Sequence, residues 1–222
     1  MLANAAASPA PTGIRTRMPT PPPATALLID FDGVLRRWPS GYAGLERRHG
    51  LPSGSLRETA FAPALIAALV EGRLDDAAWR ARVTQILTER HCAADAAGAV
   101  AQWSTDIGEI DRDLLAVLDA CTAQRRVLVS NGSTRLRRDL AAHGLADYFD
   151  AVINSSEIGV AKPAAAFFTA ALAAAGVPAA QAVFVDDSAG HVAAATALGL
   201  RAHCYVDLAG ARVFLHDCGL LA

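Results

Sequence analysis

Polar side chains that could do chemistry together stand at the ends of short apolar runs in this chain. They comprise four carboxylates, a hydroxyl, a carboxamide and an ammonium: Asp30, Asp32, Ser130, Asn131, Lys162, Asp186 and Asp187. Carboxylates held close together repel one another, and their pKa values rise unless a cation is bound between them. Mg²⁺ is a hard cation that takes oxygen ligands and often keeps a substrate phosphate in its shell. These residues therefore predict a magnesium site for a phosphorylated substrate, provided that the fold brings them together.

The remaining polar groups suit the phosphate of such a substrate. The Lys162 ammonium and the Ser130 hydroxyl could neutralise and hold phosphate oxygens. Gly33 and Gly132 would allow backbone amides to approach an anion closely, because glycine carries no side chain. A plainer interpretation of residues 30–33 is a turn after a strand, which Asp and Gly also favour.

The spacing of apolar runs and helical segments predicts a sheet that would collect these groups. Apolar runs without polar alternation, typical of strands buried on both faces, cover 26–29, 126–129, 151–153, 182–185 and 202–206. Helical patterns between them cover 111–123, 135–143, 163–176 and 188–198. This alternation predicts an α/β fold whose parallel strands are joined by right-handed crossovers. The polar groups would then meet at the carboxyl edge of the sheet.

Residues 36–109 do not fit the alternation. They contain no good buried strand, and their helical patterns are clearest over 61–70 and 75–89, where Trp79 and Val83 share one face. We interpret this segment as a helical insert after the first strand. Such an insert lies over the carboxyl ends of the strands, where open parallel sheets bind ligands.

The composition limits the class of protein. The chain has 222 residues, 53% of them apolar, and a formal net charge of −2, which suits a folded domain with an insert. No charge excess points to nucleic acid or to a membrane surface. Four cysteines without a C-x-x-C pair favour free thiols in the cytoplasm. Residues 1–23 are rich in proline, lack a secretory apolar stretch and predict a disordered tail. The oligomeric state is left open.

The polar groups and their neighbours resemble four ordered motifs of the haloacid dehalogenase (HAD) superfamily of hydrolases. The four segments are residues 28–35, residues 129–132, Lys162–Pro163 and residues 184–188. Their order and spacing agree with the family over 24–35 and 110–222. The resemblance implies that these two ranges form a Rossmann-like parallel sheet core with helices on both faces. It implies that 36–109 form a small all-helical cap domain, as in the subgroup whose cap follows the first motif.

The resemblance also implies a covalent mechanism. Asp30 would attack phosphorus and become an aspartyl phosphate. Asp32 would protonate the leaving alcohol and then take a proton from the hydrolytic water. Dehalogenating members lack a carboxylate at this second position, so Asp32 favours phosphoryl transfer.

Roles for the other groups follow from the same resemblance. Mg²⁺ would be held by the Asp30 side chain, the Asp32 carbonyl and Asp187, with Asp186 bound directly or through water. The phosphate would be held by Ser130, Asn131, Lys162 and Gly33. His191 stands where many relatives have Asp, Asn or Gly, and could bond Lys162, bond a metal-bound water or face solvent.

The resulting hypothesis is a magnesium-dependent phosphatase that acts on a small phosphorylated metabolite. The alternatives are a sugar phosphomutase of the same fold, a non-catalytic protein that binds a phosphorylated ligand, and a 2-haloacid dehalogenase, which Asp32 disfavours. Three arginines, Arg135, Arg137 and Arg138, are expected on a solvated helix face. The tryptophans Trp38, Trp79 and Trp103 could line a pocket, but packing between cap and core is expected.

Overall fold

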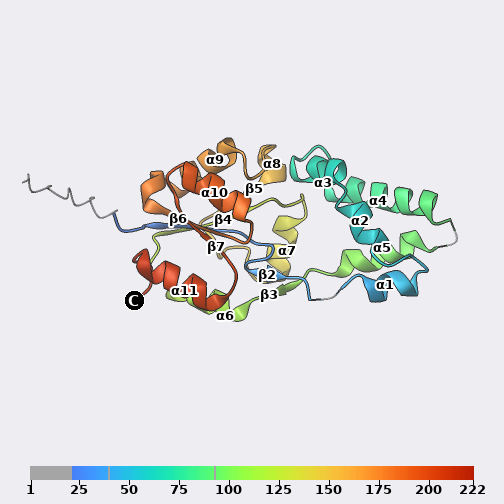
Figure 1. Cartoon of the computed structure of the whole chain (residues 1–222), viewed down its shortest axis with the longest axis horizontal. Helices are drawn as coiled ribbons and strands as arrows, with labels where there is room; N and C mark the ends of the chain where they lie inside the picture. The colour runs from blue at the N-terminus through green and yellow to red at the C-terminus, as the bar shows by residue number, and fades with distance from the viewer. Residues whose placement is uncertain (1–21, 40, 93) are drawn as a thin grey trace, which may run out of the picture.

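The computed structural model describes residues 22–39, 41–92 and 94–222, so the predicted tail lies outside it except for Pro22 and Pro23. At its centre is a parallel five-stranded sheet with the strand order β5-β4-β1-β6-β7 (Figure 1). The strands are β1 (Ala26–Ile29), β4 (Arg125–Ser130), β5 (Ala151–Asn154), β6 (Ala182–Asp186) and β7 (Arg201–Cys204). The predicted α/β fold is confirmed.

Helices cover both faces of this sheet because its central strand is apolar on both sides. Leu27 and Ile29 of β1 pack into one cluster, and Ala26 and Leu28 pack into the other. The helices around the sheet are α6 (Arg112–Ala120), α7 (Leu136–Ala142), α8 (Ser155–Ile158), α9 (Ala165–Ala175), α10 (Ala189–Ala197) and α11 (Leu208–Asp217). Figure 1 shows α9 and α10 on one face and α6 and α11 on the other.

The strand order creates a switch point beside β1. After β1 the chain continues to β4 and β5 on one side, and it then returns to β6 and β7 on the other. The carboxyl ends of β4, β1 and β6 therefore lie side by side, because neighbouring strands are parallel and in register. Open parallel sheets bind their ligands at such a point.

Residues 36–109, which we call the cap, are mainly helical and have an apolar cluster of their own, built around Leu56, Val83 and Leu87. Their helices are α1 (Ala43–Arg48), α2 (Ser55–Ala60), α3 (Pro63–Val70), α4 (Asp76–Arg90) and α5 (Ala96–Thr105). Two short antiparallel strands, β2 (Arg36–Arg37) and β3 (Glu109–Ile110), form the two connections to the sheet. The cap lies beyond the carboxyl edge of the sheet (Figure 1).

Three predicted boundaries need correction. Pro163 was expected in the first turn of a helix, but a turn that closes from the Ala164 amide to the Ala161 carbonyl comes first, and α9 begins at Ala165. The helix predicted over 61–70 begins at Pro63, and the strand predicted over 202–206 is β7 over 201–204. None of the helices in the described ranges combines the length and the apolar character needed to cross a membrane.

Candidate active site

The Lys162 ammonium lies at the centre of the candidate site. It donates to the Val129 carbonyl at 3.0 Å and to Asp186 Oδ2 at 2.7 Å, and it lies 2.9 Å from Asp30 Oδ1. Its side chain is fully buried. An ammonium has three donors, and each has an acceptor here. Lys162 thus connects the ends of β4, β1 and β6.

Asp30 follows β1 and is almost completely buried. Its Oδ1 accepts a hydrogen bond from the Phe31 amide at 2.7 Å, and its own amide donates to the Val185 carbonyl of β6. Burial raises the pKa of the Asp30 carboxyl to about 8, although the nearby Lys162 ammonium acts in the opposite direction. A bound cation would favour the carboxylate form.

Asp186 ends β6 and has partners on both carboxylate oxygens. Oδ2 accepts from Lys162, and Oδ1 accepts from the Ser188 amide at 2.8 Å and lies 2.9 Å from His191 Nδ1. Burial alone would raise the pKa of Asp186, but the contacts with His191 and Lys162 hold it below its ordinary value. His191 therefore contacts the carboxylate that orients Lys162, a partner that differs from the three placements considered from the sequence.

Asp187 lies against the loop that follows β1. A Cβ on Gly33, whose φ is +83°, would come within 2.1 Å of Asp187 Oδ2, so only glycine allows this approach. Burial and the neighbouring Asp186 raise the pKa of the Asp187 carboxyl. The Gly33 amide donates to the Arg36 carbonyl at 2.9 Å. This amide, which was predicted to bind phosphate, therefore already has an acceptor.

These acidic groups suit a divalent cation with oxygen ligands. Asp30, Asp186 and His191 each have one donor atom within 4.8 Å of the others. Asp187 adds a third carboxylate from the same two loops, whereas Lys162 supplies a single positive charge. Burial is the main cause of the raised pKa values of Asp30 and Asp187, and Asp186 adds to both; the site as a whole has an excess of negative charge. A hard divalent ion such as Mg²⁺ would remove it.

Ser130 and Asn131 stand at the end of β4 in different roles. Ser130 is buried and pairs with Asn154 of β5 in the sheet register. The Asn131 carboxamide accepts from the Lys162 amide at 2.8 Å and donates to the Lys162 carbonyl at 2.9 Å. The Asn131 side chain thus fixes the backbone that carries the lysine, and the expected contact of Asn131 with phosphate stays a prediction.

The Asp32 carboxylate is held from one side by an arginine. Its Oδ1 accepts from Arg36 Nε at 2.7 Å and from Trp38 Nε1 at 2.8 Å, and its Oδ2 accepts from Arg36 Nη2 at 2.9 Å. The guanidinium lies over the Phe31 and Trp38 rings and donates to Asp139 of α7 at 2.9 Å. Arg36 is buried, so Asp32 is fixed by a rigid neighbour.

Asp139 and Arg135 extend this contact to the cap and were not predicted as site residues. Arg135 Nε donates to Asp139 at 2.8 Å, and its Nη1 donates to the Ser104 carbonyl of α5 at 3.0 Å. The prediction that Arg135 lies on a solvated helix face is therefore wrong, because this side chain is buried. The expectation holds for Arg137 and Arg138, whose side chains are 60% and 67% exposed. The i, i+4 spacing of Arg135 and Asp139 is a signal that could have indicated the pair.

A cavity of about 1040 Å³ joins the site to the cap. Asp32, Asn131, Lys162 and Asp187 line it from the core, while Trp79 and other aromatic and arginine side chains line it from the cap. Trp79 packs within the cap, with its ring centroid 5.2 Å from that of Trp103, rather than between cap and core. Charged groups of the core therefore line one side of the cavity, and aromatic side chains of the cap line the other.

Comparison with known proteins shows the family to which the chain belongs. Residues 24–199 match the family model of the haloacid dehalogenase-like hydrolases. This match covers more than half of the chain, and the chain therefore belongs to that family. It is a HAD-like hydrolase with a Rossmann-like core, as the motifs predicted.

Two curated relatives share part of the sequence. Haloacid dehalogenase-like hydrolase domain-containing protein 3 of Danio rerio is 38% identical over 81 residues, or 36% of this chain. The protein of the same name from Xenopus laevis is 39% identical over 89 residues, or 39% of this chain. These matches span 34% and 36% of the relatives' own length, about a third.

Solved structures share the fold at low identity. A HAD family enzyme from Bacteroides thetaiotaomicron, in complex with magnesium and inorganic phosphate, is 20% identical with a TM-score of 0.66, over 83% of this chain and 97% of that one. The L-2-haloacid dehalogenase of Xanthobacter autotrophicus is 23% identical with a TM-score of 0.58, over 81% and 76%. Both likenesses concern the fold alone.

Proposed function

We propose that this hydrolase is a Mg²⁺-dependent phosphatase that cleaves a small phosphorylated metabolite through an aspartyl phosphate on Asp30. The observation that carries the proposal is the Asp32 carboxylate, two residues beyond Asp30 and on the wall of the same cavity as Lys162. A carbon–halogen bond breaks without protonation of the leaving group, whereas an alkoxide needs a proton. The magnesium and inorganic phosphate bound by the Bacteroides relative support the same choice.

The geometry suggests how the two steps are divided. The Phe31 amide and Lys162 hold the Asp30 carboxylate in place for attack on phosphorus. The bond between phosphorus and the alcohol oxygen breaks, and Asp32 gives its proton to that oxygen. Asp32 then takes a proton from water, which attacks the phosphorus of the aspartyl phosphate and releases inorganic phosphate and free Asp30.

The remaining charges act on the phosphate and the cation. Lys162, with Ser130 beside it, would stabilise the negative charge of the transferred group. Asp30, Asp187 and the Asp32 carbonyl would hold Mg²⁺, which supplies further positive charge toward the phosphate oxygens. Asp186 and Asn131 act indirectly, because one orients the Lys162 ammonium and the other fixes its backbone.

Substitution of the two aspartates tests this proposal. With Mg²⁺ and a generic aryl phosphate, Asp30→Asn is expected to lower kcat by at least about 10³-fold, since it removes the nucleophile. Asp32→Asn is expected to lower kcat more strongly for an alkyl phosphate than for a nitrophenyl phosphate, whose leaving group needs no proton. Retained activity of Asp30→Asn, or halide release from a 2-haloacid without phosphate ester hydrolysis, would refute the proposal.

A further inference from the structure

The cap side of the cavity is a continuous aromatic surface. Ring centroids are 6.2 Å apart for Tyr42 and Trp103, 5.2 Å for Trp79 and Trp103, and 6.3 Å for Phe61 and Trp79. All four rings line the cavity. Such a wall favours ligands with a flat or apolar body, because aromatic faces gain contact area without needing polar partners.

Two aromatic side chains of this cavity are exposed to an unusual degree. Phe61 is 46% exposed and Trp38 is 40% exposed, and both belong to the few large apolar side chains at the surface of the described residues. Apolar groups left open within a hollow, rather than scattered over the surface, mark a contact site for a ligand. The Trp38 indole donates to Asp32, so its ring lies where the leaving alcohol would be protonated.

The charges of the cavity wall single out one cap residue. Four arginines line the cavity, and three of them are ion-paired: Arg36 with Asp32 and Asp139, Arg80 with Asp76, and Arg135 with Asp139. The guanidinium of Arg57, on α2, makes no ion pair or hydrogen bond with another residue in the described part of the chain, although the Arg57 carbonyl accepts from the Phe61 amide. Arg57 is thus the cavity arginine whose donors are available to a ligand.

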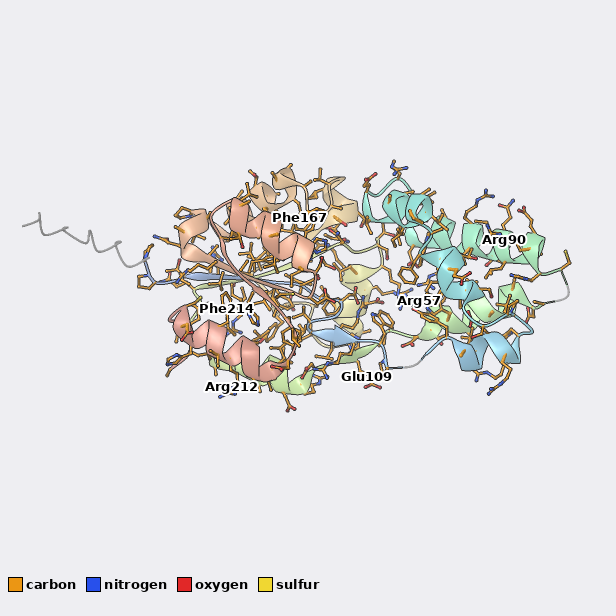
Figure 2. The ribbon with its side chains drawn as sticks, in the orientation of Figure 1. Arg57, Arg90, Glu109, Phe167, Arg212 and Phe214 are labelled. Atoms are coloured by element: carbon orange, nitrogen blue, oxygen red, sulfur yellow. The ribbon has the colours of Figure 1, made fainter. Side chains whose placement is uncertain are left out.

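The position of Arg57 places its charge at the cavity and not on the outer face of the cap. Burial raises the pKa of the Tyr42 phenol, and the positive charge of Arg57 opposes that rise, so the guanidinium lies near this part of the wall. Figure 2 shows Arg57 on the side of the cap that faces the core. An arginine presents planar N–H groups that match a carboxylate.

We propose that Arg57 binds a second anionic group, a carboxylate, on the alcohol part of the substrate. The substrate class is then a phosphate monoester whose alcohol has a flat or apolar body and ends in a carboxylate. Its phosphate would lie at Lys162, its body along Trp38 and Phe61, and its carboxylate at Arg57. This inference rests on the proposed phosphatase function, which supplies the phosphate position.

The test uses pairs of aryl phosphates with matched leaving groups. One member carries a carboxylate on one, two or three para methylenes, and the other carries the corresponding neutral carboxamide. For the wild-type protein with Mg²⁺, we expect kcat/KM to favour the carboxylate by about tenfold at one chain length, mainly through KM. Arg57→Gln should bring that ratio close to one, and Arg57→Lys should restore part of it.

Arg90→Gln is the matched control, because it removes the same charge from the end of the cap that lies far from the core (Figure 2). It should keep the wild-type ratio. A damaged fold would lower both rates together and leave the ratio unchanged, so the ratio reports on Arg57 itself. A wild-type ratio near one at every chain length, or a ratio that survives Arg57→Gln, would overturn the inference and leave the phosphatase proposal intact.

A binding measurement separates this inference from the proposed reaction. If neither ester is hydrolysed, the phosphatase proposal fails, and calorimetry with Asp30→Asn protein then decides the inference alone. Binding of the carboxylate ester about tenfold more tightly than the carboxamide, lost when Arg57→Gln is added, supports it. Equal binding of the two esters contradicts it.

Discussion

One buried ammonium is shared between two carboxylates at the end of the sheet. Lys162 lies 2.9 Å from Asp30 Oδ1 and 2.7 Å from Asp186 Oδ2, with both carboxylates buried. Charges in such a place are costly unless they are paired, and one ammonium cannot balance two neighbouring carboxylates and Asp187 as well. The residues thus form an unbalanced set to which a divalent cation would bring neutrality.

This imbalance predicts pH-dependent binding of the metal. Burial raises the pKa of Asp30 to about 8 in the metal-free protein, so Mg²⁺ must displace the Asp30 proton when it binds below that pH. We expect its affinity to fall as the pH is lowered from about 9 to about 6, by up to about tenfold per pH unit for each proton displaced. Calorimetry in two buffers of different ionisation enthalpy measures both the affinity for Mg²⁺ and the number of protons released. A Kd that does not vary with pH, without proton release, would contradict this expectation.

Among the elements, the short strand β2 does more than join the cap to the core. Its first residue, Arg36, pairs with Ile110 of β3 and places its guanidinium between Asp32 and Asp139. Asp32, the proposed general acid, is therefore anchored to the same connection that carries the cap. We treat Arg36 as a positioning residue, because its contacts orient Asp32.

Because of this role, Arg36→Met should affect the hydrolysis of alkyl phosphates more than that of nitrophenyl phosphates. Without the two guanidinium contacts, Asp32 keeps the Trp38 indole as a donor but is held less firmly, while Asp139 keeps Arg135 as a partner. We expect kcat for an alkyl phosphate to fall about tenfold more than kcat for a nitrophenyl phosphate, because only the alkoxide depends on protonation. Steady-state rates with both esters provide the measurement, and Arg36→Lys should recover part of the loss. Equal losses for both esters would indicate a purely structural role.

At the level of the whole molecule, the sequence was enough to predict the sheet and the convergence of its polar ends. Apolar runs such as 26–29 and 182–185 have no polar alternation, and parallel strands place their carboxyl ends at one edge. The contacts of Lys162 with Asp30 and Asp186 are the outcome of that rule.

The parts that could not be predicted depend on contacts across long separations in the chain. Arg36 and Asp139 lie 103 positions apart, and no local pattern relates them. The prediction for Arg135 failed for the same reason, since two of its partners, the carbonyls of Ser104 and Asp106, lie about 30 positions away at the boundary of the cap. The role of Asn131 likewise depended on where the Lys162 backbone passes.

The most direct test of the account is to trap the phosphorylated protein. Rapid acid quench during turnover of a phosphate ester with Mg²⁺, followed by borohydride reduction and peptide mass spectrometry, locates any acyl phosphate. We expect a modified residue at Asp30, absent from Asp30→Asn protein and from protein without substrate. A modification at Asp32 or Asp187 instead, or steady hydrolysis with no trapped species and full activity of Asp30→Asn, would contradict it.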